Sequence, residues 1–238
     1  MYEPHSIKFG LYSQNDGTLD FYMRVGQLAD AEKVYIDFGA GRGQWYEDDP
    51  ISFRKRARHM QGRFKEVVGA DIDPAVMKNN AVDRSVLMRD GTLPMLDQSS
   101  DVIVADYVIE HIENPKSFAS EIDRLLKPGG WFCARTPHKL HYIAMGDRLI
   151  PESLAKFVLH RAQPGRKEED VFPKIYKLNT MRDIAEAFPG WHNHSFIYRT
   201  DPGYFFGSRA IYTVADFFHR VMPAAFSGNL FIFLQKPL

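Results

Sequence analysis

A glycine-rich turn directly follows the apolar run 34–38 and reads Gly39-Ala40-Gly41-Arg42-Gly43. Glycines in such a turn let the backbone approach a bound nucleotide at the carboxyl end of a strand. A dinucleotide site of the G-x-G-x-x-G type needs its third glycine at position 44, which is Gln44. Here the third glycine comes one residue earlier. This spacing favours a nucleoside over the turn and disfavours a nicotinamide-dependent oxidoreductase.

Acidic residues follow the next two apolar runs. Asp71, followed by Ile72, ends the run 67–71, where a carboxylate can accept hydrogen bonds from both hydroxyls of a ribose. Asp90-Gly91 follows the run 86–88 and could accept a hydrogen bond from an adenine amino group, although an ordinary Asp-Gly turn is the alternative. Asp73 precedes a proline and fits helix capping better than ligand binding.

A fourth apolar run, within 101–112, emerges at Asp106-Tyr107 and continues into a helix. His111 lies one helical turn later, and its ordinary pKa range suits a general base at neutral pH. The alternative is that Glu110 and His111 only orient the helix. His138, beyond the fifth apolar run, is a second candidate base.

Strands must position these side chains. The nearly continuous apolar runs at 34–38, 67–71, 86–88, 102–105 and 131–134 are typical of strands that are covered on both faces. Between them, Asp49-Pro50 has the pattern of a helix start, and 117–126 has the spacing of an amphipathic helix. Alternating strands and helices predict a doubly wound α/β sheet.

The C-terminal part is less regular. We expect helices near 151–162 and 180–188 and strands at 192–199 and 229–235. The aromatic stretch 204–206 precedes a helix with Ile211, Val214, Ala215 and Phe218 at helical spacing, and we expect this part to form the far edge of the sheet. The aromatics with Arg209 are expected to cover that edge, with contact to membrane lipid as the alternative. We interpret 1–238 as one domain with a cofactor-binding core at 33–137. The segments 138–176 and 200–222 are expected to cover the acceptor pocket.

Four motifs occur in this order: the glycine turn 39–43, Asp71, Asp90-Gly91 and the segment 101–112. Together with the following Leu126-Lys127-Pro128-Gly129-Gly130-Trp131, they resemble the class I methyltransferases, particularly the bacterial group near the ubiquinone-pathway O-methyltransferases. The resemblance covers roughly 33–137. It implies a Rossmann-like seven-stranded sheet of order 3-2-1-4-5-7-6 with the seventh strand antiparallel, and S-adenosyl-L-methionine as cofactor. It also implies that Asp37, Gly39, Ala40 and Gly41 line the methionine end, Asp71 and Ile72 the ribose, Asp90 and Gly91 the adenine, and that Asp106 and Tyr107 lie where methyl and acceptor meet.

Composition narrows the class further. Lys plus Arg and Asp plus Glu number 30 each, a balance that argues against a dedicated nucleic-acid binder. The single cysteine fits a reducing, cytoplasmic compartment, and no apolar run is long enough to span a membrane. The basic run 54–58 is interpreted as a solvated helix face, or alternatively as a phosphate-docking site. No metal is expected, because Tyr107 stands where the related enzymes carry an acid.

The sequence therefore predicts a methyltransferase that acts on a hydroxyl of a small molecule or glycan precursor, with S-adenosyl-L-homocysteine as product. Two alternatives stay open: an RNA or protein methyltransferase, and a non-catalytic module that binds an adenosine ligand. The oligomeric state and the acceptor are not specified by the sequence.

Overall fold

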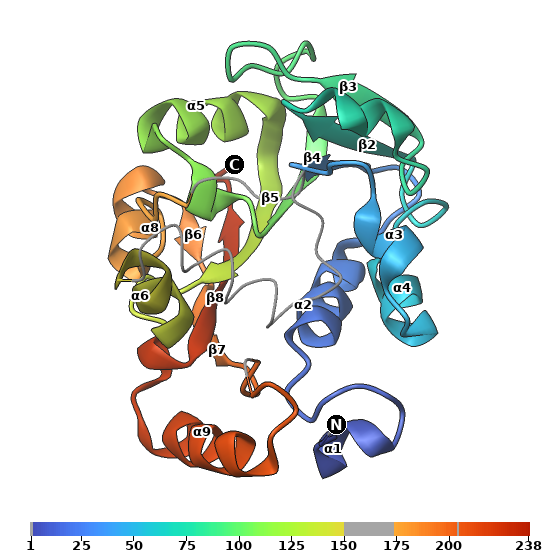
Figure 1. The fold of residues 1–238 in the computed structure, drawn as a ribbon. Coiled ribbons are helices and arrows are strands. Elements are labelled where there is room, and N and C mark those ends of the chain that lie inside the picture. Colours follow the sequence, from blue (N-terminus) through green and yellow to red (C-terminus); the bar gives the residue numbers. More distant parts are fainter. Residues whose placement is uncertain (1, 150–173, 204) are drawn as a thin grey trace.

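The computed structural model describes residues 2–149, 174–203 and 205–238 (Figure 1). One twisted sheet runs through the molecule, with α2, α3 and α4 on one side and α5, α6 and α8 on the other (Figure 1). The helix expected at 151–162, and most of the expected cover segment 138–176, lie outside the described residues. No helix within the described ranges is long and apolar enough to cross a membrane.

The sheet has the strands β1 (Val34–Phe38), β2 (Glu66–Asp71), β3 (Arg84–Leu87), β4 (Ser100–Asp106), β5 (Leu126–Pro137), β6 (His192–Asn193), β7 (Phe196–Arg199) and β8 (Gly228–Gln235). Their order is β3-β2-β1-β4-β5-β8-β6, with β7 also paired to β8. Strands β1 to β5 pair in parallel, and β8 is antiparallel to β5. The expected Rossmann-like order is confirmed.

The sheet departs from seven strands because the sixth is divided into β6 and β7, which both pair with β8. The division falls at residues 194–195. There the Ser195 amide donates to the Asn193 side chain at 2.9 Å, and the Ser195 hydroxyl accepts from the Phe233 amide at 3.1 Å. These bonds replace the regular ladder pairing at that point, so the last strand is counted as the eighth.

The helices are α1 (His5–Lys8), α2 (Gly17–Val25), α3 (Gln44–Asp48), α4 (Ser52–Arg58), α5 (Pro115–Leu125), α6 (Tyr142–Leu149), α8 (Met181–Ala187) and α9 (Arg209–Val221). Short 3₁₀ turns are η1 (Gly26–Leu28), η2 (Pro74–Lys78), η3 (Ile109–His111) and η5 (Ala224–Phe226). The expected helices near 117–126 and 180–188 correspond to α5 and α8.

The helix start expected at Asp49-Pro50 is wrong. Helix α4 begins at Ser52, and the Asp49 carboxylate instead accepts from the Ile51 amide at 2.9 Å in a local turn. An aspartate can bond to its own backbone two residues on, and this competes with N-capping.

Two apolar cores cover the two faces of the sheet. Phe118, Ile122 and Leu125 of α5 pack on one face together with Ile184 of α8. On the other face, α2 contributes Phe21, Tyr22 and Val25. The central strands are buried from both sides, which explains their nearly continuous apolar sequences.

Helix α9 differs from its expected packing. Ile211, Val214 and Phe218 do not cover the sheet edge, because they are 45%, 57% and 47% exposed. The inward side instead carries Tyr212 and His219. Amphipathic spacing identified the helix correctly but assigned its apolar face to the wrong side.

Candidate cofactor and acceptor site

Parallel pairing brings the ends of β1, β2 and β4 to one edge of the sheet. Phe38 pairs with Ala70, and Asp37 pairs with Val104. Consequently Asp37, Asp71 and Asp106, from strands far apart in the sequence, lie at the same edge. In open α/β sheets, this carboxyl edge is where ligands bind.

The glycine turn needs two of its glycines for steric reasons. Gly39 has φ +77°, and a Cβ there would collide with the Val108 side chain. Gly43 has φ +76°, and a Cβ there would collide with the amide of Asn79. That buried amide donates to the carbonyls of Ala40 and Gly41, at 3.2 Å each. Asn79 thus fixes the shape of the turn, a role for which the sequence carries no motif.

Asp71 joins the turn to the end of β2. Its carboxylate accepts from the Gly41 amide at 2.8 Å and from the Asp73 amide at 2.9 Å. Each carboxylate oxygen retains a second lone pair, so both can still accept from a ligand. Asp73 caps η2 through the Ala75 amide at 2.8 Å, in agreement with its expected capping role.

Asp90 and Gly91 form the tip of a tight turn, with φ +50° and +75°. Arg89 and Thr92 exchange two backbone bonds across it, at 3.0 and 2.9 Å. The ordinary-turn interpretation of Asp-Gly therefore describes the backbone correctly. Both residues nevertheless line the cavity described next.

One cavity of about 1140 Å³ opens at this edge of the sheet. It is lined by every residue expected to bind the cofactor and by the first candidate base: Asp37, Gly39, Ala40, Gly41, Asp71, Ile72, Asp90, Gly91, Asp106, Tyr107 and His111. Ile72 is 64% exposed despite its apolar side chain. Such a side chain beside the turn offers an apolar face to a flat ring.

A buried network of ion pairs forms the wall of the cavity at the end of β4. Arg135 binds the Asp106 carboxylate with two bonds, at 2.7 and 2.8 Å. Tyr22 donates to the same carboxylate at 3.1 Å, and Arg58 lies 3.2 Å from it. Burial alone would raise the pKa of Asp106, but the two guanidinium groups hold it below its ordinary value. Asp106 is therefore an ionised anchor for the wall.

Asp37 differs from Asp106 in its pKa. Burial raises its pKa to about 7, and the neighbouring Asp106 and Asp71 carboxylates add to the rise although Arg58 opposes it. Asp37 therefore exchanges its proton near neutral pH. A cation bound next to it would favour the ionised form.

Arg58 was not assigned to the site from the sequence. Its guanidinium lies between the rings of Trp45, at 4.6 Å, and Tyr22, at 5.0 Å. Arg54, one turn earlier, pairs with Asp16 at 2.6 Å. The interpretation of the run 54–58 as a solvated face is wrong for these two arginines, since both turn inward to carboxylates.

Two buried donors at this end of the cavity have no hydrogen-bond partner among the described residues: Nε of Arg58 and the indole Nε1 of Trp45. Burying a donor unsatisfied is costly, so these two atoms can bind an acceptor from a water or a ligand in the cavity. A carboxylate offers acceptors of this kind.

Glu110 and His111 face different surroundings. The buried Glu110 carboxylate accepts from Thr136 at 2.8 Å, and its backbone carbonyl accepts from the Ile175 and Tyr176 amides. Burial raises the pKa of Glu110 to about 7, although the Thr136 bond opposes the rise. Glu110 thus holds the turn in place, whereas His111 lines the cavity.

The structure does not bring His138 to the cavity lining. Its ring is buried, and its Nδ1 accepts from the Leu140 amide at 3.1 Å. Burial lowers the pKa of His138. No group of three or more His, Cys, Asp or Glu side chains able to hold a metal ion occurs in the described part of the chain.

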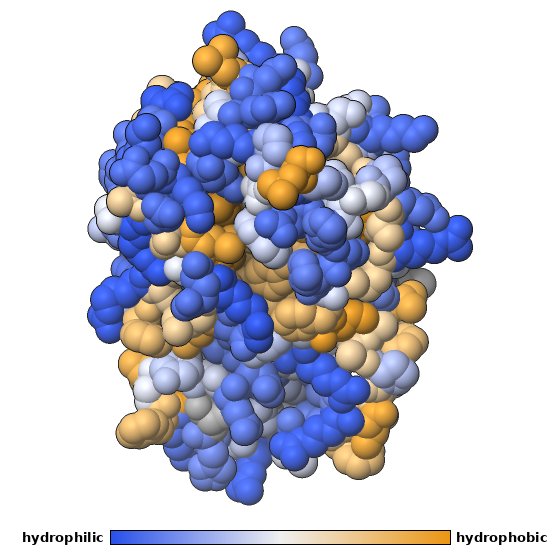
Figure 2. Space-filling model, turned by 180° about the vertical axis from the view of Figure 1, so that it is seen from behind, coloured by the Kyte–Doolittle hydropathy of each residue, from blue (hydrophilic) through white to orange (hydrophobic). Residues whose placement is uncertain are grey.

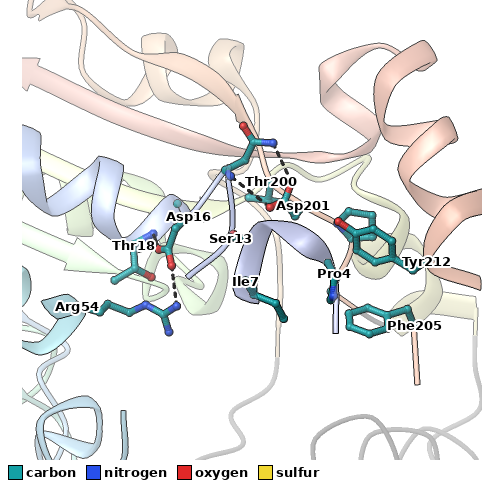
Figure 3. Close-up of a pocket in the computed structure, with 14 residues that line it drawn as sticks. Pro4, Ile7, Ser13, Asp16, Thr18, Arg54, Thr200, Asp201, Phe205 and Tyr212 are labelled. Atoms are coloured by element: carbon teal, nitrogen blue, oxygen red, sulfur yellow. Dashed lines mark hydrogen bonds and ion pairs between the residues drawn. The ribbon is translucent and has the colours of Figure 1, made fainter. Parts of the chain in front are cut away.

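A second cavity, of about 310 Å³, is lined by residues of the N-terminal segment 4–18, by 200–203 and by Phe205 and Tyr212 (Figure 3). The Asp16–Arg54 pair and the two Asn15–Asp201 hydrogen bonds lie in its walls. Figure 3 shows Phe205 and Tyr212 on the other side of the cavity. Arg135 connects the two cavities, because it also donates to Thr18 at 2.8 Å. One layer of side chains thus separates this cavity from Asp106.

Comparison with known proteins identifies the family. The chain matches the family described as a methyltransferase domain over residues 13–191. It is 36% identical over 107 residues to a probable S-adenosylmethionine-dependent methyltransferase of Mycolicibacterium smegmatis, covering 43% of this chain and 38% of that protein. The chain thus spans well under half of that relative.

Solved structures share the fold. A SAM-dependent methyltransferase from Aquifex aeolicus superposes with a TM-score of 0.51 at 12% identity, over 99% of both chains. A geranyl diphosphate C-methyltransferase from Streptomyces coelicolor gives 0.54 at 13% identity, over 92% of this chain and 77% of that one. The chain therefore belongs to the methyltransferase domain family, whose cofactor is S-adenosylmethionine.

Proposed function

We propose that this protein transfers a methyl group from S-adenosyl-L-methionine to a hydroxyl of a small molecule or glycan precursor. The observation that carries the proposal is the large cavity lined by the glycine turn, the three strand-end acids and His111. Its volume of about 1140 Å³ exceeds the roughly 300–1000 Å³ typical of a site for one ligand. The cavity can therefore hold a cofactor and a small acceptor together.

The cofactor would be held by residues around the turn. Asp71 would accept from the ribose hydroxyls, and Ile72 with Asp90-Gly91 would border the adenine. Asp37 would face the ammonium group of the methionine part. The unpartnered donors of Arg58 and Trp45 would bind its carboxylate. These roles give each of the three buried groups a partner of complementary charge or hydrogen bonding.

The bound cofactor supplies an activated methyl group on a positively charged sulfur. The chain contributes mainly alignment and the exclusion of water. Tyr107 is held in the left-handed conformation, φ +57°, and its hydroxyl accepts from Asn229 at 2.7 Å. This fixes the wall where the acceptor would lie. His111 would accept the proton that the acceptor hydroxyl loses as the new carbon–oxygen bond forms.

Oxygen as the acceptor atom rests on the motif order that resembles the ubiquinone-pathway O-methyltransferases and on His111 in the cavity. The sugar class rests on the charged and aromatic C-terminal part of the chain, whose Phe205 and Tyr212 also line the smaller cavity beside Thr18 (Figure 3). We propose that residues 200–212 and the N-terminal segment shape this side of the acceptor pocket.

The RNA alternative is disfavoured by Arg54 and Arg58. A nucleic-acid surface needs exposed cations for phosphates, but both of these arginines are engaged with carboxylates. A purely cofactor-binding module is disfavoured by a cavity volume above the range typical of a site for one ligand.

The test is a methyl-transfer screen with cofactor labelled on the methyl group and panels of sugars, sugar nucleotides and phenols. We expect the labelled methyl group to appear in at least one hydroxyl acceptor. We expect His111→Ala to abolish most of this incorporation. Label that appears only in RNA or protein would support the macromolecular alternative instead. A protein that binds cofactor but labels none of these panels would contradict the proposal.

A further inference from the structure

Helix α9 presents its apolar side to solvent. Six large apolar side chains lie along it at helical spacing, each at least 40% exposed: Ile211, Val214, Phe217, Phe218, Val221 and Met222. We call them the α9 stripe. Soluble proteins seldom leave so many neighbouring large apolar side chains uncovered unless the surface binds something.

Polar contacts fix this orientation. Arg199 donates to the carbonyls of His219, Arg220 and Met222 at the end of the helix, at 2.9 to 3.0 Å. On the inner side, His219 Nδ1 lies 2.7 Å from the carbonyl oxygen of Thr200. Rolling the stripe inward would break these bonds and bury polar groups against the sheet. The exposure of the stripe is therefore built into the fold.

The N-terminal segment adds to the same end of the molecule. The Tyr2 amide donates to the Gly207 carbonyl at 2.8 Å, and its ring packs on Phe205 and Tyr212. Beyond α1, Phe9 and Leu11 project into solvent at 92% and 67% exposure. Figure 1 shows α1 and α9 together at one end of the molecule, and Figure 2 shows from behind that this end is hydrophilic in the middle with hydrophobic groups towards both sides.

The chemistry of this end matches a lipid surface. The exposed apolar groups come from two separate segments, and no stripe residue lines either of the two cavities. A bilayer accepts apolar side chains from separate segments without a matching hollow, whereas a second copy must supply a complementary surface. Exposed Lys8 and Arg209 can meet lipid phosphates, whereas Arg220 is paired with Asp216 at 2.9 Å and Glu3 is an exposed acid of the N-terminal segment.

We propose that the α9 stripe, together with Phe9 and Leu11, docks this protein peripherally on a phospholipid bilayer, with α9 lying in the plane of the interface. The smaller cavity lies between the same two segments and is one layer of side chains from Asp106. Docking here would bring that cavity next to the lipid headgroups. The inference concerns where the protein sits and does not depend on which acceptor it methylates.

The test is co-sedimentation of the full chain with vesicles of phosphatidylcholine, with and without phosphatidylglycerol. The wild type is expected to bind, more strongly with phosphatidylglycerol. Phe217→Gln/Phe218→Gln should reduce the partition coefficient by roughly tenfold or more, because less apolar surface enters the interface. Phe9→Ser/Leu11→Ser tests the second segment independently. The matched control is Met23→Ser/Leu96→Ser, two exposed apolar residues outside this surface, and it should bind like the wild type.

Each variant is first titrated with S-adenosylhomocysteine, so that a misfolded variant and a failure of the proposed function are recognised separately. The proposal is overturned if the wild type does not sediment with either vesicle, or if both stripe and N-terminal variants bind as well as the control. It is also overturned if ultracentrifugation shows a dimer that only the stripe variant dissociates. That result would assign the surface to a second copy of the chain.

Discussion

The guanidinium of Arg58, at the end of α4, lies 3.2 Å from the carboxylate of Asp106, at the end of β4. The pair connects a helix on one face of the sheet to the edge where the glycine turn lies. It also places one cation beside two carboxylates, since Arg58 influences Asp37 and Asp106 together. The cavity is therefore shaped by charge as well as by the turn.

Replacing Arg58 tests whether its unpartnered Nε binds the carboxylate of the cofactor. Arg58→Met keeps much of the apolar stem but removes the charge and its donors. We expect S-adenosylhomocysteine to bind roughly tenfold to a hundredfold more weakly in calorimetry, the usual effect of losing hydrogen bonds to a charged group. Arg56→Met, two residues away on the same helix and exposed, is the control and should leave the affinity unchanged. Equal affinities for the two variants would remove Arg58 from the cofactor site.

Asp71→Ala should weaken the same ligand by about 1.5–3 kcal/mol, because its carboxylate would accept from the ribose hydroxyls. Asp73→Ala is an informative control, since it removes a nearby acid that only caps η2. We expect Asp73→Ala to lower the free energy of unfolding by about 1 kcal/mol without changing cofactor affinity. If both substitutions weaken binding alike, the ribose role of Asp71 is wrong.

Cofactor affinity should depend on pH through Asp37. Its pKa is raised to about 7, chiefly by burial, so the carboxyl is largely protonated below pH 7 and ionised above it. An ionised Asp37 attracts the ligand's ammonium group, and affinity should rise between pH 6 and pH 8. Asp37→Asn should flatten this rise. Titrations at three pH values measure it, and a slope that persists in the variant would point to another group.

The free energy of unfolding of the ligand-free protein should fall as the pH rises, whereas cofactor affinity should rise. Burial raises the pKa of Glu110 to about 7 from an ordinary 4.5. The folded protein therefore keeps a proton that the unfolded chain releases, and the associated stabilisation is complete below about pH 4.5 and lost as the pH rises to about 7. Glu110→Gln resembles the protonated acid and should reduce this loss, by up to about 3 kcal/mol at pH 8. Urea unfolding at pH 5.5 and pH 8 checks it, and an unchanged pH slope would contradict the role of burial.

His111→Ala should lower turnover by about 10²–10⁴, the range of general-base catalysis, with cofactor affinity nearly unchanged. The measurement is single-turnover methyl transfer to the acceptor found in the screen. A variant that keeps the full rate would favour the orienting role, in which the Glu110–Thr136 bond alone holds the turn.

The sequence predicted the fold and much of the cavity because parallel strands end at one edge. Once Asp37, Asp71 and Asp106 are placed at strand ends, the sheet order alone brings them together. His111 followed from its distance after β4. The positions of these residues could be predicted without knowing how the helices pack on the sheet.

Arg58 and Trp45 could not be found in this way, because their positions depend on the angle at which α3 and α4 lie against the sheet. Asn79 was missed for a similar reason: its partners are backbone carbonyls of a turn far away in the sequence. The orientation of α9 was misjudged because spacing shows that a helix has an apolar side, but not where that side faces. Arg199 fixes that orientation by donating to backbone carbonyls at the end of α9. Because every residue has a backbone carbonyl, the sequence does not reveal these partners.

The most direct test of the account is calorimetric titration of the wild-type chain with S-adenosylhomocysteine, with NADH as the parallel control. The cavity and the glycine spacing predict saturable micromolar binding of S-adenosylhomocysteine and no binding of NADH. Binding of NADH alone, or of neither ligand, would contradict the assignment of the turn at Gly39–Gly43 to a methyl-donor nucleoside.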